Sequence, residues 1–562
     1  MMTLLRGALY TVAILSLPRA ARAQTQDEPI VTTRHTTTVG GRTLRYTARA
    51  GRIPIRDNEA GDVHGQMFFV SYTLDRAPND PPRPLTFVWN GGPGSNAALV
   101  HLIGFGPKRM TPRPGAKPGD GSRWIIESNP GTWLEDTDLV FLDPIGTGYS
   151  RPTRAEYATE FYQTRGDAES VAEFVRVYRT RFDAFDAPLF LAGESYGVTR
   201  AAAVADALQM RGTEVRGVIL IGSGLPLGST PPATRSALGL PTLVVAAFTN
   251  NKLAPDLQRD LAATQKQAEV WAENEYARAL ARRDSLSDAE RDSVVRALSR
   301  FTGLDASLID RRTLVVSRMQ LGNYLLRREG KFVGQYDSRM LGPLDTTQAP
   351  YDPTKDPSLL DLLDDVMILR YLRDDLGYKS DLRYQGPFGG GYPPPTTFRG
   401  DWMSTRWNRP APTSTATANA ATNPAGNAPT NAAGNPPANA PPNATPGSGN
   451  QPQNRPASAG QGGRGAGAGR DTTAPPPQPL RNAMRSNPSL RVLVGCGIYD
   501  LVCDYYGNVW SANNLDPAIR RNVVAHWYPG GHAVYTDPRA HMQMKRDVSS
   551  FIRGALVPAG SR

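Results

Sequence analysis

Residues 187–197, APLFLAGESYG, decide the fold of this chain. Residues 187–192 form an apolar run that is typical of a buried strand, and glycines stand on both sides of the serine that follows. Residues 198–208 then continue with a helical pattern. A strand that breaks into a helix at Gly-Glu-Ser-Tyr-Gly holds the serine hydroxyl exposed at the carboxyl end of the strand. The sequence therefore predicts that Ser195 is a nucleophile on a strained turn.

Short apolar runs elsewhere predict the other strands of the same sheet. They lie at residues 85–89, 138–142, 217–222, 490–494 and 523–528, and several end in glycine-rich loops. Such runs are typical of buried parallel strands. Alternating residues between 31 and 74 predict antiparallel strands at the sheet edge. We expect a mostly parallel, doubly wound sheet, which around an elbow serine is an α/β-hydrolase fold.

Composition divides the chain into five predicted segments. Residues 1–23 resemble a secretory signal peptide, residues 24–237 the first part of the α/β core, and residues 238–395 a mostly helical cap insertion. Residues 396–480 are rich in Ala, Asn, Pro and Gly and predict a disordered low-complexity insertion. Residues 481–562 complete the core. We expect the low-complexity segment to be a tolerated surface insertion, and the alternative is a flexible tether or a loop that interacts with the cell wall.

The amino terminus and the charge distribution limit the classes of function. Arg6, an apolar run over residues 8–17 and Ala21-Arg22-Ala23 predict cleavage before Gln24, and export to the periplasm or medium. That run is too short to span a bilayer of about 30 Å, so we expect no integral membrane segment after signal removal. The net charge is +11, but the basic residues are scattered, and we expect no nucleic-acid partner.

The chain contains two cysteines, Cys496 and Cys503. They form either one disulfide or a pair of reduced, packed thiols, and the sequence leaves both open. So few cysteines and histidines argue against a metal site, and we expect no cofactor. The oligomeric state is not predicted by the sequence.

A nucleophilic serine needs a base and an acid that orients the base, and the chain offers them in the order Ser, Asp, His. Asp500 follows the strand near residue 494, and His532 lies in the loop after the last strand. We therefore expect a catalytic triad of Ser195, Asp500 and His532. Three rivals fit less well, because Asp504 is expected inside a helix, His526 inside a strand and His541 in the terminal helix.

The loop Asn90-Gly91-Gly92-Pro93-Gly94 follows a strand at the place from which it would approach the elbow serine. Acyl transfer requires donors for the oxyanion, and glycine lets the backbone come close to a substrate. We expect the amides of Gly92 and Tyr196 to form the oxyanion hole.

Together, these motifs resemble the serine carboxypeptidases, in a branch of bacterial type. The resemblance rests on residues 89–94, the Gly193–Gly197 elbow, the Asp500 loop, Gly531-His532, Asp537 and the segment FLDPIGTGYS at 141–150. It covers about residues 84–222 and 490–552. It implies an acyl-enzyme on the serine, peptide substrates, no cofactor, and binding of the peptide's free carboxylate by Asn90 and Glu194.

One departure from this family bears on function. Eukaryotic members carry a second glutamate that pairs with the one matching Glu194, and Gly104 stands at its position here. Paired acids share a proton, so its loss predicts weaker carboxylate recognition or a pH optimum nearer neutrality. An esterase or acyltransferase that uses the same triad is therefore the first alternative. The second is a non-catalytic exported surface or scaffold protein.

Overall fold

A computed structural model describes residues 29–57, 59–77, 79–115, 124–227, 230–346, 355–359, 362, 365–386 and 478–557. The predicted signal peptide, residues 1–23, lies outside the described residues. Nearly all of the predicted low-complexity segment, residues 396–480, lies outside them as well. Its last residues are described, and they enter a helix that begins at Pro479.

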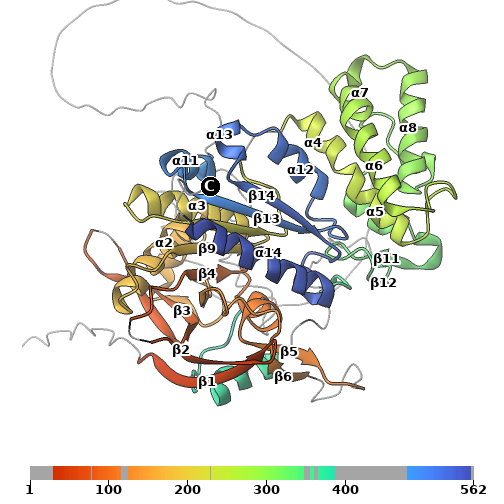
Figure 1. Ribbon diagram of the computed structural model, residues 1–562. Helices are drawn as coiled ribbons and strands as arrows, with labels where there is room; N and C mark the ends of the chain where they lie inside the picture. Colours follow the sequence, from red (N-terminus) through yellow and green to blue (C-terminus); the bar gives the residue numbers. More distant parts are fainter. Residues whose placement is uncertain are drawn as a thin grey trace, which may run out of the picture. The chain divides into compact units, whose positions relative to one another are not determined.

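A ten-stranded mixed sheet forms the centre of the structure (Figure 1). Its first three strands and the pairing of β3 with β7 are antiparallel, whereas all neighbours from β7 to β14 run parallel. A short strand, β8 (Arg151–Pro152), pairs with β3 at the side. Each predicted apolar run is found as a strand. In spatial order the strands are β1 (Val31–Val39), β2 (Arg42–Arg56), β3 (Val63–Leu74), β7 (Asp138–Leu142), β4 (Leu85–Trp89), β9 (Leu189–Glu194), β10 (Gly217–Ile221), β13 (Arg491–Gly497) and β14 (Val523–Tyr528).

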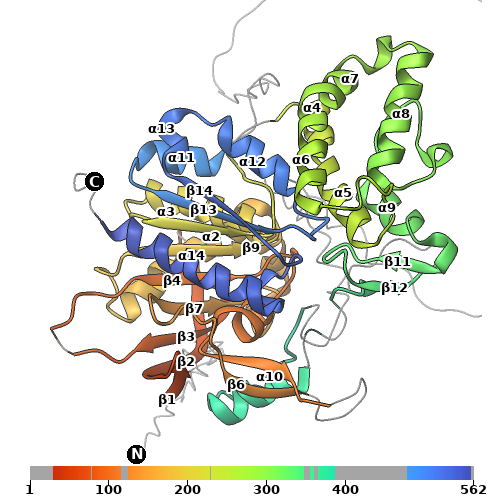
Figure 2. The same cartoon turned by 45° about the vertical axis from the view of Figure 1, so that its right-hand side comes forward.

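Helices cover both faces of this sheet, as Figures 1 and 2 show. Strand side chains alternate between the two faces, so that Leu189 and Leu191 enter one core and Phe190 and Ala192 the other. The first core is closed by α2 (Thr164–Arg181), α3 (Gly197–Met210), α11 (Pro479–Ser486) and α13 (Pro517–Arg520). The second is closed by the π-helix η1 (Leu99–Phe105), α14 (Pro538–Leu556), α10 (Asp365–Arg370) and the π-helix η8 (Tyr371–Asp375). The predicted doubly wound α/β-hydrolase architecture is confirmed.

A group of helices between β10 and residue 324 has an apolar core of its own. Figure 2 shows these helices grouped in green beside the sheet. They are α4 (Pro232–Leu238), α5 (Leu240–Thr249), α6 (Leu261–Trp271), α7 (Ala277–Ala281), α8 (Asp288–Thr302) and α9 (Arg318–Tyr324). The group begins at Pro232, earlier than the predicted boundary at 238. It also ends before α10, because Ile368, Tyr371 and Leu372 pack in the core of the second sheet face.

Smaller elements complete the described structure. Two antiparallel hairpins are made by β5 (Lys108–Pro112) with β6 (Trp124–Ser128) and by β11 (Lys331–Val333) with β12 (Leu341–Pro343). The other helical segments are η2 (Ala155–Tyr157), α1 (Ala158–Phe161), η3 (Ala272–Tyr276), η4 (Arg283–Ser285), η5 (Ala306–Leu308), η6 (Arg327–Glu329), α12 (Tyr505–Asn513) and η12 (Val534–Thr536). Within the described ranges, no helix combines the length and the apolar character needed to cross a membrane.

Candidate active site

Ser195 occupies the sharp turn between β9 and α3. Its φ of 58° lies in the left-handed region, where a residue with a side chain is strained. The turn is held because the Ser195 amide donates to the Ile221 carbonyl at 2.8 Å. A Cβ at Gly193 would lie 2.0 Å from the Gly197 carbonyl oxygen, so glycine is required there. The predicted nucleophile elbow is therefore present in the structure.

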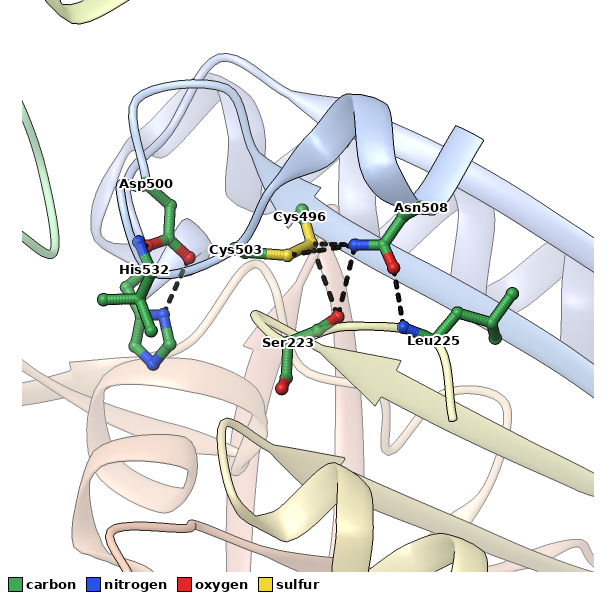
Figure 3. Close-up of a disulfide and its surroundings, with 8 residues drawn as sticks. Ser223, Leu225, Cys496, Asp500, Cys503, Asn508 and His532 are labelled. Atoms are coloured by element: carbon green, nitrogen blue, oxygen red, sulfur yellow. Dashed lines mark hydrogen bonds and ion pairs between the residues drawn. A yellow bond between two sulfur atoms is a disulfide. The ribbon is translucent and has the colours of Figure 1, made fainter. Parts of the chain in front are cut away.

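His532 and Asp500 form an ion pair in the loops that follow β13 and β14. The Nδ1 atom of His532 lies 2.7 Å from Asp500 Oδ2, and Figure 3 shows this contact as a dashed line. Both side chains are buried. Asp500 Oδ1 accepts from the Val502 amide at 2.7 Å, and the His532 amide donates to the Tyr336 carbonyl. The carboxylate and the imidazole are thus fixed from several sides.

The groups around His532 change the pKa of its imidazole. Burial by itself would lower the pKa of His532, but the charge of Asp500 and its hydrogen bond outweigh burial and raise that pKa above its ordinary value. An imidazole that gains a proton more readily is a better base toward a serine hydroxyl.

The second contact of the predicted triad, between the serine and the histidine, is not a hydrogen bond in the described residues. No hydrogen bond joins the Ser195 hydroxyl to His532 among the described residues. The two groups nevertheless belong to adjoining segments. Ser195 bonds to Ile221, and a Cβ on the next residue, Gly222, would lie 3.2 Å from the His532 ring. Catalytic contacts of this kind are often long before substrate binds.

The three rivals lie elsewhere. Asp504 is the N-cap residue of α12 rather than a residue inside the helix. His526 lies in β14, where it faces Asp547, and His541 is buried in α14. Asp500 and His532 are the predicted carboxyl and imidazole, and the fold places them in contact. Their roles as acid and base stay a prediction.

The loop after β4 packs directly against the elbow. A Cβ at Gly91 would lie 2.4 Å from the Tyr196 amide nitrogen, so that the loop and the elbow touch through their backbones. Gly92 has a φ of 96° and lies exposed at the loop tip. The predicted oxyanion donors, the amides of Gly92 and Tyr196, therefore belong to two segments that lie next to each other. Their role as donors stays a prediction.

Asn90 and Glu194 form a hydrogen-bonded pair beside the elbow. Asn90 Nδ2 donates to Glu194 Oε2, and Asn90 Oδ1 accepts from the Val100 amide at 3.2 Å. Glu194 Oε1 is buried without a hydrogen-bond partner among the described groups. Burial raises the pKa of Glu194 to about 7, against the lowering effects of His532, Tyr535 and Asn90. A carboxyl of this kind can be protonated near neutral pH.

Arg200 is a supporting residue that the sequence analysis did not single out. It is completely buried in α3, donates to the Asn90 carbonyl at 2.7 Å and forms an ion pair with Asp167 at 2.8 Å. It therefore fixes the backbone of the Asn90 loop. A charged residue within the alanine-rich helical run at 198–208 was the available signal.

A disulfide between Cys496 and Cys503 closes the loop that carries Asp500. Figure 3 shows Asn508 beside both sulfurs, and its Nδ2 also donates to the Ser223 carbonyl at 3.3 Å. Asn508 Oδ1 accepts from the Leu225 amide at 2.6 Å. The bridge, which the sequence left open, thus ties the Asp500 loop to α12 and to the segment after β10.

Within the described part of the chain, no group of three or more His, Cys, Asp or Glu side chains is placed to hold a metal ion. The chemistry available from the described side chains is that of a serine, a buried imidazole and a buried carboxylate, which together suit acyl transfer.

Comparisons with known proteins agree with this chemistry. Residues 48–295 match the family model described as serine carboxypeptidase. The pheromone-processing carboxypeptidase KEX1 of Yarrowia lipolytica is 30% identical over 183 residues, which are 32% of this chain and 27% of that protein. Its namesake from Komagataella phaffii is 32% identical over 162 residues, or 27% of this chain and 22% of that protein. This chain spans about a quarter of the length of these curated relatives.

Solved structures also align with this chain. The crystal structure of KEX1(delta)p, a prohormone-processing carboxypeptidase from Saccharomyces cerevisiae, aligns over 92% of this chain and 93% of that chain, with a TM-score of 0.49 and 14% identity. A thermostable carboxyl esterase from Bacillus coagulans aligns over 94% of this chain and 100% of that chain, with a TM-score of 0.31 and 12% identity.

Proposed function

We propose that this chain, whose residues 48–295 match the serine carboxypeptidase family model, releases C-terminal residues from peptides through an acyl-enzyme on Ser195. One observation carries the proposal. A strained serine elbow and a buried His532–Asp500 pair stand at the carboxyl ends of β9, β13 and β14, which belong to one sheet. That arrangement supports nucleophilic attack on a carbonyl carbon.

In the proposed reaction, His532 Nε2 takes the proton of the Ser195 hydroxyl while Ser195 Oγ attacks the carbonyl carbon of the last peptide bond. Asp500 holds the imidazole by its Nδ1–H and stabilises the imidazolium. The amides of Gly92 and Tyr196 receive the oxyanion. His532 then gives the proton to the departing amine, and the C–N bond breaks. Water, activated by His532, hydrolyses the acyl-enzyme and restores Ser195.

We propose Asn90 and Glu194 as the site for the peptide's free C-terminal carboxylate. They adjoin Ser195 in the structure, since Glu194 precedes it in the chain and Asn90 bonds to Glu194. A protonated Glu194 donates a hydrogen bond to a carboxylate, whereas an ionised one repels it. Recognition of free-acid peptides should therefore weaken as pH rises through about 7, the pKa of Glu194.

We further propose that the protein is exported to the periplasm or medium. The signal-like pattern of residues 1–23 supports this, and so does the Cys496–Cys503 disulfide, because disulfides persist in oxidising compartments. Cell fractionation with amino-terminal sequencing of the mature chain tests the proposal. A mature chain that begins at Gln24 outside the cytoplasm is expected, and an uncleaved cytoplasmic chain would refute it.

The activity is tested with the purified mature protein and its Ser195→Ala variant. Both are incubated with free-acid peptides, C-terminally amidated copies and simple esters, and the products are identified by mass spectrometry across pH. The matched control is Ser486→Ala, which removes an exposed hydroxyl at the end of α11. Stepwise loss of C-terminal residues from the free acids, retained in the control and abolished in Ser195→Ala, is the expected result.

Other outcomes point to the alternative functions. Ester cleavage without peptide trimming would reassign the site to an esterase, or to an acyltransferase if an added amine captures the acyl group. A wild-type protein that turns over none of the substrates would refute enzymatic function and favour the scaffold.

A further inference from the structure

The place of the family's second glutamate is lined by a tyrosine. A Cβ built on Gly104 would lie 3.6 Å from three ring atoms of Tyr535, which is ordinary contact. The ring of Tyr535 therefore occupies the space next to position 104. The same residue reaches the carboxyl that the absent glutamate would have paired with, because its hydroxyl donates to Glu194 Oε2 at 2.8 Å.

Tyr535 is held firmly in this position. It is buried in η12, three residues after His532, and its ring packs edge-on against Phe105 with the centroids 5.0 Å apart. Phe105 in turn stacks on Trp133 at 3.8 Å. A buried side chain that packs against such a stacked pair can define the position of the atom to which its hydroxyl bonds.

We propose that Tyr535 replaces the missing acid as the positioning residue of the C-terminal carboxylate site and thereby sets specificity for free-acid peptides. The inference rests on the proposed carboxypeptidase function. In it, Tyr535 contacts Glu194 rather than the reacting atoms, and it acts by determining which oxygen of Glu194 faces the substrate.

The hydrogen bonds around Glu194 determine where its proton resides. Oε2 accepts from two donors, the Tyr535 hydroxyl and Asn90 Nδ2, and so serves as an acceptor. Oε1 has no partner among the described residues. When Glu194 is protonated, the proton is therefore expected on Oε1, from which it can be donated to a substrate carboxylate.

The titrating groups that face Glu194 are His532, Asp500 and Tyr535. The charge of His532 lowers the pKa of Glu194, and Asp500 raises it. Burial, together with the charge of Glu194 and its hydrogen bond, raises the pKa of Tyr535 well above the ordinary value, so that this phenol keeps its proton at every working pH. The site thus has one titrating carboxyl where paired acids would give two coupled steps.

The test is Tyr535→Phe, which removes the hydroxyl and keeps the ring. Well below pH 7, where Glu194 is protonated in both proteins, we expect KM for free-acid peptides to rise by roughly tenfold while kcat changes little. The reason is that Glu194, without its hydrogen bond from Tyr535, no longer holds Oε1 toward the substrate carboxylate. Removing a donor that stabilises the ionised carboxylate also raises the pKa of Glu194. The alkaline limb of kcat/KM should therefore move to higher pH. Ester substrates, which lack the carboxylate, should show neither change.

Two further variants separate positioning from folding. Tyr46→Phe removes another buried phenol oxygen in the same core and should leave selectivity unchanged. Glu194→Gln removes the titrating carboxyl, so Tyr535→Phe in that background should no longer shift the pH profile. The melting temperature of each variant shows whether it is folded.

A folded Tyr535→Phe protein that keeps the wild-type KM ratio of free-acid to amidated peptides and the wild-type pH limb would overturn the inference. The same holds if its activity falls equally on peptides and esters, because that pattern marks a general structural role. Failure of the wild-type protein to trim any peptide is a different result, since it overturns the proposed function itself.

Discussion

At the scale of single residues, the site depends on the buried contact between Asp500 and His532. Asp500 raises the pKa of His532 against the effect of burial. In Asp500→Asn, burial prevails, so the pKa of His532 should fall and the acid limb of kcat/KM should move to lower pH. The amide also favours the wrong imidazole tautomer, and kcat should drop by about 10⁴-fold. The pH profile is measured with an ester substrate, because an ester has no free carboxylate to bind at Asn90 and Glu194.

The matched control for Asp500→Asn is Asp504→Asn. Asp504 is a half-buried carboxyl whose pKa is raised to about 6 by burial and by the charge of Asp500. Among the described residues it makes no hydrogen bond to His532. Its variant should keep the wild-type acid limb. An Asp500→Asn protein with nearly full activity would show that another group orients His532.

The contribution of Glu194 to the free energy of unfolding depends on pH. Its pKa is raised from 4.5 to about 7 by burial, so the folded state binds the proton more tightly than the unfolded state. That stabilisation is complete at low pH and is lost as pH rises through about 7. The Glu194→Gln side chain does not titrate, so the variant does not lose stability in this way. Relative to wild type, the variant should gain on the order of 2–3 kcal/mol in free energy of unfolding between pH 5 and pH 9.

Urea unfolding of both proteins at the two pH values measures this difference. Asp143, whose pKa burial also raises to about 7, is present in both proteins and cancels in the comparison. A difference that stays constant with pH would mean that Glu194 does not change its protonation on unfolding in this range.

At the scale of elements, the loop between β13 and α12 is short and closed by the Cys496–Cys503 disulfide. Closing a loop of this length restrains the unfolded chain and contributes about 2 kcal/mol in the loop-entropy model. Replacing both cysteines by serine should lower the free energy of unfolding by that amount and increase hydrogen exchange in residues 497–503. Activity should fall as well, because Asp500 lies in this loop.

Reducing the disulfide with dithiothreitol tests the same prediction independently. Reductant should bring wild-type protein to the stability of the double serine variant and leave the variant itself unchanged. Equal stability of oxidised wild type and variant would show that Asn508 and the packing around the sulfurs hold the loop without the bridge.

Elements that the sequence predicted are those with a local signal. The strand, elbow and helix around Ser195 follow from apolar runs and glycines within one short stretch. The Asp500–His532 pairing followed from chain order and strand ends. The contact of Tyr535 with Glu194 joins residues 341 positions apart, and no local pattern encodes such a contact. The return of α10 to the sheet face is non-local in the same way.

At the scale of the whole molecule, the described residues, which lie between 29 and 386 and between 478 and 557, belong to one compact unit. Every proposed site residue belongs to this unit, and α11 and β13 begin only after residue 477. Deleting residues 409–476 therefore removes no strand of the sheet and no site residue. We expect kcat/KM within about twofold of wild type and an unchanged melting temperature, as for tolerated loop deletions.

A second deletion, within the described part of the chain, serves as the contrast. Removing residues 479–486 takes away α11, whose Leu480 and Met484 pack against the first sheet core, and should prevent folding. Together, the two deletions distinguish the residues that the core requires from those that it does not require. Loss of activity in the 409–476 deletion, with folding intact, would give that segment a direct part in substrate binding. Loss of export alone would assign it a role outside the reaction.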